Sequence, residues 1–142
     1  MKRIVLILTL VTLLATACSG GQQEETATDL SLVATDIAFD NERLEVGVNQ
    51  PVRLTLENAG ALEHDFSVRE IAVHDVHAAE GKADDHAMTE DAHELALHVA
   101  APPGGGRAVL EFTPTEPGEY EFFCTVAGHK EAGMVGTLVV GP

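Results

Sequence analysis

Apolar and polar residues alternate with a period of two along most of this chain, and that pattern restricts the fold more than any other feature. Residues 52–57 read Val-Arg-Leu-Thr-Leu-Glu, and residues 108–112 and 120–124 continue the pattern. No long stretch with the 3.6-residue period of an amphipathic helix competes with it. Gly, Pro and Asn residues separate about seven or eight such short segments. We therefore expect an all-β domain, folded as an antiparallel Greek-key β-sandwich.

The first 17 residues have the composition of an export signal. Two basic residues precede an apolar run at 4–14, and Ala15-Thr16-Ala17 supplies small residues for cleavage. The run is shorter than the roughly 20 residues of a membrane-spanning helix. Cleavage before Cys18 and acylation of its thiol would make a bacterial lipoprotein, held on the periplasmic or cell-surface face of a membrane. Residues 18–28 are polar and aperiodic and would be its flexible tether. The alternative is a secreted protein with a frayed N-terminus.

Residues 29–142 suffice for one domain. The whole chain is strongly acidic, with 23 Asp and Glu residues against 8 Lys and Arg residues. This charge makes nucleic acid and anionic lipid surfaces poor partners, whereas a basic protein would be attracted. Contact with a membrane is accordingly expected through the lipid anchor.

The cysteines carry the strongest chemical signal. The chain has only two, and if Cys18 carries lipid then Cys124 has no disulfide partner. A lone thiol in an oxidising compartment is either an inert buried side chain or a ligand. Cys124 is followed at short range by His129 and Met134, and His64 begins a predicted strand upstream. Two His, one Cys and a weakly bound Met form the ligand set of a mononuclear blue-copper site. The sequence therefore predicts one copper ion.

Three phrases carry a resemblance to a known family: Glu63-His-Asp-Phe-Ser-Val68, Pro117-Gly-Glu-Tyr-Glu-Phe-Phe-Cys124 and Gly128-His-Lys-Glu-Ala-Gly-Met-Val-Gly-Thr-Leu-Val-Val140. In these phrases the chain resembles the single-domain cupredoxins of the plastocyanin, azurin and auracyanin group. The resemblance covers roughly residues 31–140, apart from a His-rich insertion. It implies that copper is bound in a trigonal plane by three residues and axially by a fourth: His64, Cys124 and His129 in the plane, and Met134 on the axis.

The resemblance also implies roles for neighbouring residues. Asp65 and Thr125 are expected to hydrogen-bond across the two ligand loops, where relatives usually carry Asn in place of Asp65. A carboxylate there would favour Cu(II) and lower the reduction potential. A small apolar rim around the edge of His129 would be the electron port, formed by Ala61, Leu62, Ala127 and Gly128.

An insertion at about residues 74–95 interrupts the alternation. It is dense in Asp and Glu, and it holds five possible metal ligands: His74, His77, His86, Met88 and His93. Its composition favours a solvated acidic loop. The alternative is a weak site that collects copper or zinc, with His74 and His77 spaced for one face of a helical turn.

These observations predict a type 1 blue-copper protein that carries single electrons between redox partners outside the cytoplasm. A cytochrome or a membrane oxidase or reductase complex is the expected partner, and the carrier is expected to be a monomer. Enzyme activity is not expected, because a complete His₂CysMet shell leaves no open position for substrate. The alternatives are a copper-binding or delivery protein in copper homeostasis and a metal-free adhesion or scaffold module.

Overall fold

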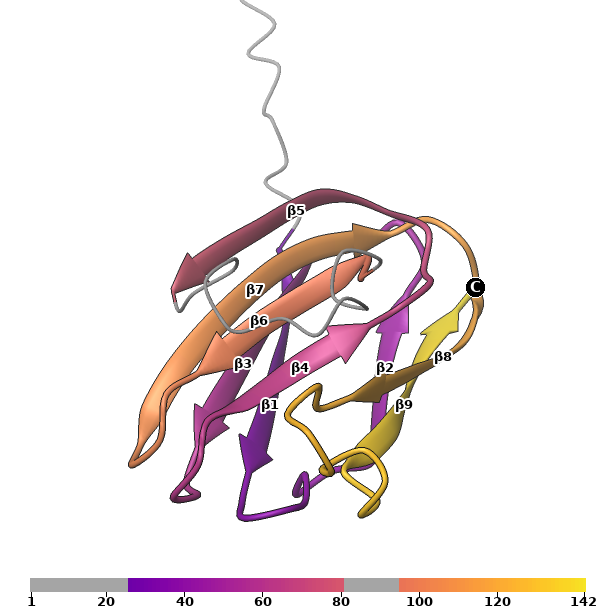
Figure 1. Ribbon diagram of the computed structural model, residues 1–142. Coiled ribbons are helices and arrows are strands. Elements are labelled where there is room, and N and C mark those ends of the chain that lie inside the picture. The colour runs from indigo at the N-terminus through magenta and orange to yellow at the C-terminus, as the bar shows by residue number, and fades with distance from the viewer. Residues whose placement is uncertain (1–25, 81–94) are drawn as a thin grey trace, which may run out of the picture.

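The computed structural model describes residues 26–80 and 95–142, and every regular element within those ranges is a β-strand (Figure 1). The predicted signal peptide, Cys18, most of the tether, and the possible ligands His86, Met88 and His93 lie outside the described residues. The strands are, in chain order, β1 (Thr28–Ala34), β2 (Arg43–Gly47), β3 (Val52–Asn58), β4 (His64–Val68), β5 (Val73–Glu80), β6 (Leu97–Ala101), β7 (Gly106–Pro114), β8 (Gly118–Phe123) and β9 (Val135–Gly141).

The strands form two sheets. One has the order β1-β3-β7-β5 and the other has the order β2-β9-β8-β4-β6. The predicted β-sandwich is confirmed, with one correction to its antiparallel character. β1 pairs with β3 in parallel, and β2 pairs with β9 in parallel. The physical reason is the connection after β1, which carries the chain into the other sheet. A tight hairpin would have forced an antiparallel pair, but a crossover leaves the parallel direction open.

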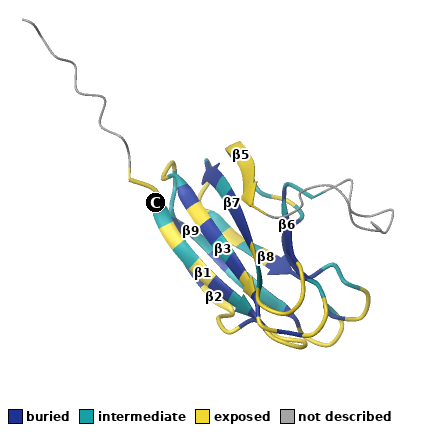
Figure 2. Cartoon of the chain, turned by 90° about the vertical axis from the view of Figure 1, so that its left-hand side faces the viewer, coloured by how far each residue is buried: buried dark blue, intermediate teal, exposed yellow. Residues whose placement is uncertain are grey.

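The core lies between the sheets and is built from the residues of one parity on each strand. On β3 the inward residues Val52, Leu54 and Leu56 are buried while the residues between them face outward. Figure 2 shows this alternation as stripes along β1 and β3. Two aromatic pairs pack in the core near the end of β8, where the Phe122 ring centroid lies 5.3 Å from that of Phe39 and 5.2 Å from that of Phe66. Each such side chain contributes about 1.5–3 kcal/mol through burial.

Strand β5 corrects the description of the insertion. Residues from about 74 onward are expected from their composition to form a solvated acidic loop, yet residues 73–80 pair antiparallel with β7. The open edge of β7 offers backbone hydrogen bonds that do not depend on side-chain polarity. The pairing is irregular, with a register shift between His74 and His77 and a positive φ of 53° at Asp75. The side chains from His74 to Glu80 nevertheless remain exposed.

Loops gather at one end of the sandwich, at the bottom of Figure 1, and they position the site. Residues 59–63 lead into β4, and residues 124–134 connect β8 with β9. The buried Asn58 holds the first loop, because its Nδ2 donates to the carbonyls of Leu62 and Ala101 at 2.8 and 2.9 Å. Its Oδ1 accepts from the Gly60 backbone N–H at 2.9 Å. The start of β4 is thus attached to both sheets of the sandwich.

Candidate metal centre

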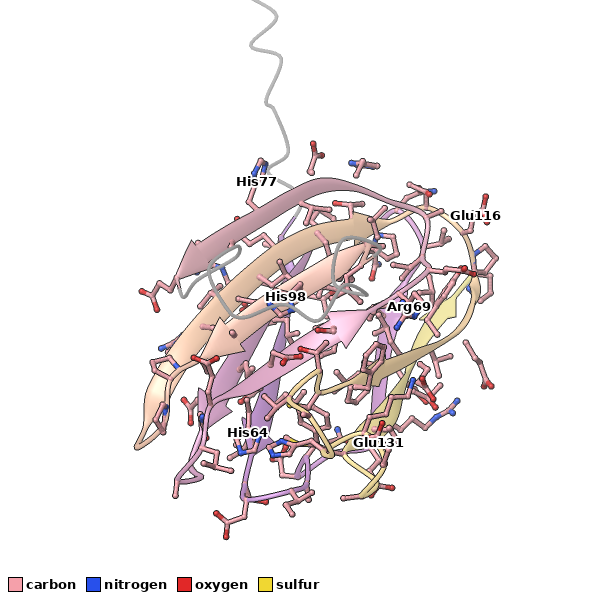
Figure 3. All side chains as sticks on the ribbon, viewed as in Figure 1. His64, Arg69, His77, His98, Glu116 and Glu131 are labelled. Atoms are coloured by element: carbon pink, nitrogen blue, oxygen red, sulfur yellow. The ribbon has the colours of Figure 1, made fainter. Side chains whose placement is uncertain are left out.

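His64 enters the site from a rigid position in the sheet. It is the first residue of β4, which lies between β8 and β6 and has all five residues buried. The imidazole Nδ1 lies 3.9 Å from the sulfur of Cys124. Figure 3 shows the ring at the loop end of the sandwich. At His64 itself β4 pairs with Ala101 of β6, whereas β8 pairs with β4 only at Ser67 and Val68. The sheet therefore holds this imidazole independently of the loop that supplies the other donors.

Cys124 and His129 come from the loop between β8 and β9. Strand β8 ends at Phe123, so Cys124 is the first residue after it, and its side chain is fully buried. Its Sγ lies 3.5 Å from Nδ1 of His129, whose ring centroid is 5.0 Å from that of His64. Nδ1 of each imidazole thus faces the thiol, one from the sheet and one from the loop.

Backbone hydrogen bonds fix the shape of this loop. The Met134 N–H donates to the His129 carbonyl at 2.9 Å, and the Cys124 N–H donates to the Met134 carbonyl at 3.2 Å. Gly128 and Gly133 have φ values of 85° and 101°, which residues with a side chain rarely adopt. The loop therefore folds back on itself and places Met134, which is fully buried, next to Cys124 in the backbone pairing.

The donor atoms of His64, Cys124 and His129 all lie within 4.8 Å of one another, and all three residues are buried. This spacing fits a single ion bound by all three. Two imidazoles, a thiolate and a thioether form a donor set suited to copper, because the soft sulfur ligands favour Cu(I) and imidazole accepts both oxidation states. His64, Cys124 and His129 would hold the metal from three sides, and Met134 is the predicted axial donor.

Burial favours the neutral forms of the donors in this pocket. Burial raises the pKa of the Cys124 thiol from 9.0 to about 12, and the nearby Asp65 carboxylate contributes to the increase. Burial also lowers the pKa of His64, and the neighbouring His129 adds to that effect. Without metal the thiol is therefore protonated at neutral pH. Cys124 would bind a metal ion as the thiolate, because the ion would supply the compensating positive charge and the sulfur would give up its proton.

Asp65 connects the two ligand-bearing segments, as the resemblance implied. Its carboxylate accepts hydrogen bonds from the Thr125 backbone N–H at 2.9 Å and from the Thr125 hydroxyl at 2.7 Å. One of its oxygens lies 3.7 Å from the sulfur of Cys124. The side chain is almost fully buried. A buried carboxylate thus lies within contact distance of the thiol.

The structure does not bring the other possible ligands into this site. His74 and His77 lie on β5 with exposed side chains, and Nδ1 of His74 is 2.7 Å from a carboxylate oxygen of its neighbour Asp75. The alternative in which the two histidines share one face of a helical turn is wrong, because they are on a strand. Among residues 26–80 and 95–142, the donors around Cys124 are the only group of three that could hold an ion.

Gly60 is a site residue that the sequence argument missed. A Cβ atom added there would lie 2.9 Å from Nε2 of His64 and 3.2 Å from the Thr35 carbonyl oxygen. That Nε2 atom is buried and has no hydrogen-bond partner within the described ranges, so packing against the Gly60 backbone helps to fix the ring. In the sequence, Gly60 was recognisable only as part of the turn that ends β3.

Comparisons with known proteins agree with this architecture. The family model described as a Cupredoxin-like domain matches residues 5–140, and the chain belongs to this family. It is 35% identical over 109 residues to the copper-resistant cuproprotein CopI of Rubrivivax gelatinosus, covering 77% of this chain. The match spans only 63% of that relative's length. CopI of Pseudomonas aeruginosa is 29% identical over an alignment of 145 positions, and the match covers 85% of this chain and 80% of the relative.

Solved structures show the same fold. A reduced auracyanin from Roseiflexus castenholzii superposes with a TM-score of 0.62 and 21% identity, covering 82% of this chain and 98% of the auracyanin. Auracyanin B gives a TM-score of 0.62 and 23% identity, covering 82% and 90%. The chain belongs to the cupredoxin-like family, and its donors lie together in one buried cluster. The cofactor of this protein is therefore one copper ion in a type 1 site.

Proposed function

We propose that this protein is a one-electron carrier. The observation that carries the proposal is the convergence of three buried donors from two independently anchored segments, with their donor atoms within 4.8 Å of one another. Copper, when bound, supplies the one-electron couple. The protein contributes a β4 position that is paired with β6 in the sheet and a loop closed by its own backbone hydrogen bonds. Such supports resist movement of the ligands when the oxidation state changes.

The surface around His129 supports electron exchange with a partner at this end of the molecule. The His129 ring is only 6% exposed, so a partner would approach it across a short distance without water entering the pocket. Around it, Ala61, Ala127 and Gly128 are exposed, and the Leu62 side chain is 57% exposed. This rim is the proposed electron port. The net charge of −15 favours a basic partner, such as a cytochrome or the basic surface of a membrane oxidase or reductase complex.

We further infer that the protein acts as a monomeric carrier and not as an enzyme. A complete set of two imidazoles, one thiolate and one thioether leaves no donor position open for substrate. Weak and short-lived encounters through a small apolar rim suit a carrier that must bind and leave its partners quickly.

The direction of β1 supports an anchored arrangement in which the electron port faces away from a membrane. β1 runs parallel to β3, and its last residue Ala34 pairs with Asn58 beside the loop that leads to His64. Thr28, at the other end of β1, therefore lies at the opposite end of the sandwich from the site. A lipid on Cys18 would be followed by residues 19–28, which reach up to about 34 Å when extended. Within the described ranges, no helix has the length and apolar character needed to cross a membrane.

The test is spectroscopic and kinetic. The domain from Thr28 onward, loaded with Cu(II), should show an intense blue absorption band and a narrow copper hyperfine splitting in electron paramagnetic resonance. The band should disappear on reduction and return on reoxidation, and electron exchange between oxidised and reduced protein should be fast. A pale copper complex, or slow electron exchange, would contradict the carrier proposal.

Copper homeostasis is a second candidate, because two relatives of this chain are named copper-resistant cuproproteins. A delivery protein must release its metal readily, whereas a carrier must retain it. Cu(I)-loaded protein mixed with a Cu(I) chelator distinguishes the two. Transfer within seconds favours delivery, and retention over hours favours electron transfer.

A further inference from the structure

A chain of side-chain hydrogen bonds leaves the metal centre through Asp65 and continues into the sheet. The Ser67 hydroxyl donates to Asp65 Oδ1 at 2.7 Å, and the same hydroxyl oxygen lies 2.9 Å from Nδ1 of His98. Ser67 on β4 and His98 on β6 are direct partners in the antiparallel register. Ser67 is fully buried, and His98 is partly exposed. The chain thus joins the metal centre to a histidine that does not touch it.

The direction of these hydrogen bonds follows from the chemistry of the groups. An ionised carboxylate can only accept hydrogen bonds, so the Ser67 hydroxyl must donate its one proton to Asp65. The Ser67 oxygen is then left with lone pairs only, and it must accept from His98. His98 therefore carries a proton on Nδ1. Polarisation along such a chain strengthens the hydrogen bond that reaches the carboxylate.

Asp65 needs this support more than an amide would. Its carboxylate is buried, and a buried charge is costly unless several donors surround it. Thr125 provides two donors on the loop side, and Ser67 provides a third on the sheet side. Loss of the thiol proton on metal binding would leave a thiolate 3.7 Å from the carboxylate, and the two negative groups would repel each other. Ser67 donates to Oδ1, the same oxygen that accepts from the Thr125 N–H, and this additional donor opposes rotation of the carboxylate away from Thr125.

We propose that Ser67 and His98 are positioning residues for the copper site. They hold the Asp65 carboxylate in the orientation that joins β4 to the ligand loop at Thr125, and they offset part of its negative charge beside the thiolate. This inference rests on the same metal site as the proposed function. It does not depend on whether the site serves electron transfer or copper delivery.

Two pairs of variants test the proposal. Ser67→Ala and His98→Leu remove the donors. Ser67→Thr keeps the hydroxyl, and His98→Asn keeps an N–H close to the position of Nδ1. The first readout, in the metal-free protein, is the hydrogen-exchange rate of the Thr125 backbone amide. This amide donates a hydrogen bond to the Asp65 carboxylate. Loss of one hydrogen bond should raise this exchange rate about fivefold in Ser67→Ala, and less in His98→Leu.

The control is the Leu54 amide on β3, in the other sheet. A variant that only destabilised the fold would speed up exchange at Leu54 and Thr125 alike. We expect faster exchange at Thr125 and unchanged exchange at Leu54, with His98→Asn close to the wild type. Unchanged exchange at Thr125, or an equal increase at both amides, would overturn the positioning role.

The second readout is the copper-loaded protein at a pH well above the range where carboxyl groups are protonated. Ser67→Ala and His98→Leu should lower the reduction potential and shift the sulfur-to-copper absorption band, because the carboxylate charge is less compensated. His98→Asn should restore both values. Potentials equal to the wild type in all variants would overturn the proposal. Slow electron exchange in the wild type would contradict only the carrier function, because Thr125 exchange and the potential do not measure that rate.

Discussion

Two pairs of histidines in this chain have opposite fates. His64 and His129 are buried at one end of the sandwich, with both Nδ1 atoms within 4 Å of the Cys124 sulfur. His74 and His77 lie on the edge strand β5 with exposed side chains, separated by a register shift. All four are near acidic residues in the sequence. The comparison shows that a histidine becomes a specific ligand only when the fold brings it close to other donor side chains and buries it away from water.

The supports around the two pairs differ as well. The ligand loop is closed by backbone hydrogen bonds, and Asp65 ties it to β4. On β5, the described partner of the His74 ring is its own neighbour Asp75. Well-supported donors bind a metal in one geometry, whereas exposed side chains bind weakly and in several. The following predictions test this contrast, in order of decreasing effect.

The largest effect is expected for Cys124→Ser. Replacing the thiol with a hydroxyl removes the ligand that gives the blue band, so the band should vanish and copper affinity should fall by several orders of magnitude. The matched control is the double variant His74→Ala and His77→Ala, which should keep the full band. Absorption spectra recorded during copper titration compare the variants. Loss of the blue band in the β5 double variant would contradict the expected difference between the two pairs of histidines.

The pH dependence of metal binding should also separate the two regions. The Cys124 thiol has a pKa of about 12 without metal, so at lower pH each bound ion must displace a proton from sulfur. Apparent affinity should therefore rise about tenfold per pH unit from neutral pH toward 12. A site made of imidazoles alone stops depending on pH above about 8, because imidazole is already deprotonated there. Competition titrations with a chelator at several pH values measure the slope, and a flat profile would place the metal away from Cys124.

Asp65→Asn should raise the reduction potential by tens of millivolts. The substitution removes a negative charge 3.7 Å from the sulfur, and that charge favours Cu(II) over Cu(I). About 60 mV corresponds to a tenfold change in the relative affinity for the two oxidation states. Asp75→Asn on β5 is the matched control, since it removes the same charge from the exposed pair with His74. Equal potentials in Asp65→Asn and the wild type would rule out the charge effect.

The smallest effect is expected for Gly60→Ala. The added methyl group would lie 2.9 Å from Nε2 of His64, so the ring or the loop must move by a few tenths of an ångström. Copper affinity should drop several-fold and the absorption band should shift, because ligand orientation depends on the surrounding packing. Gly141→Ala is the control, because its methyl group would meet the Val46 carbonyl at an ordinary 3.7 Å. Spectra of Gly60→Ala identical to those of Gly141→Ala would show that this packing does not tune the site.

Much of the fold could be read from the chain because each strand has its own local signal. The alternation in residues 52–57 and 108–112 corresponds to β3 and β7, and the inward parity of Phe66 and Phe122 places both in the core. The parallel pairings and β5 could not be read in the same way. They depend on which strand edge is free once the sheets have formed, and an exposed acidic strand has no apolar pattern to reveal it.

The sequence alone determined the types of donor and their spacing: a thiol at a strand end, an imidazole and a thioether within the next ten residues, and a second imidazole at the start of another strand. It also determined the β-rich character that lets such segments meet. Only the tertiary structure decided that His74 and His77 lie on an exposed edge strand, that Gly60 packs against His64, and that Ser67 joins His98 to Asp65 through hydrogen bonds. The physical reason is that periodicity is a local property, whereas register and burial arise from contacts between distant segments.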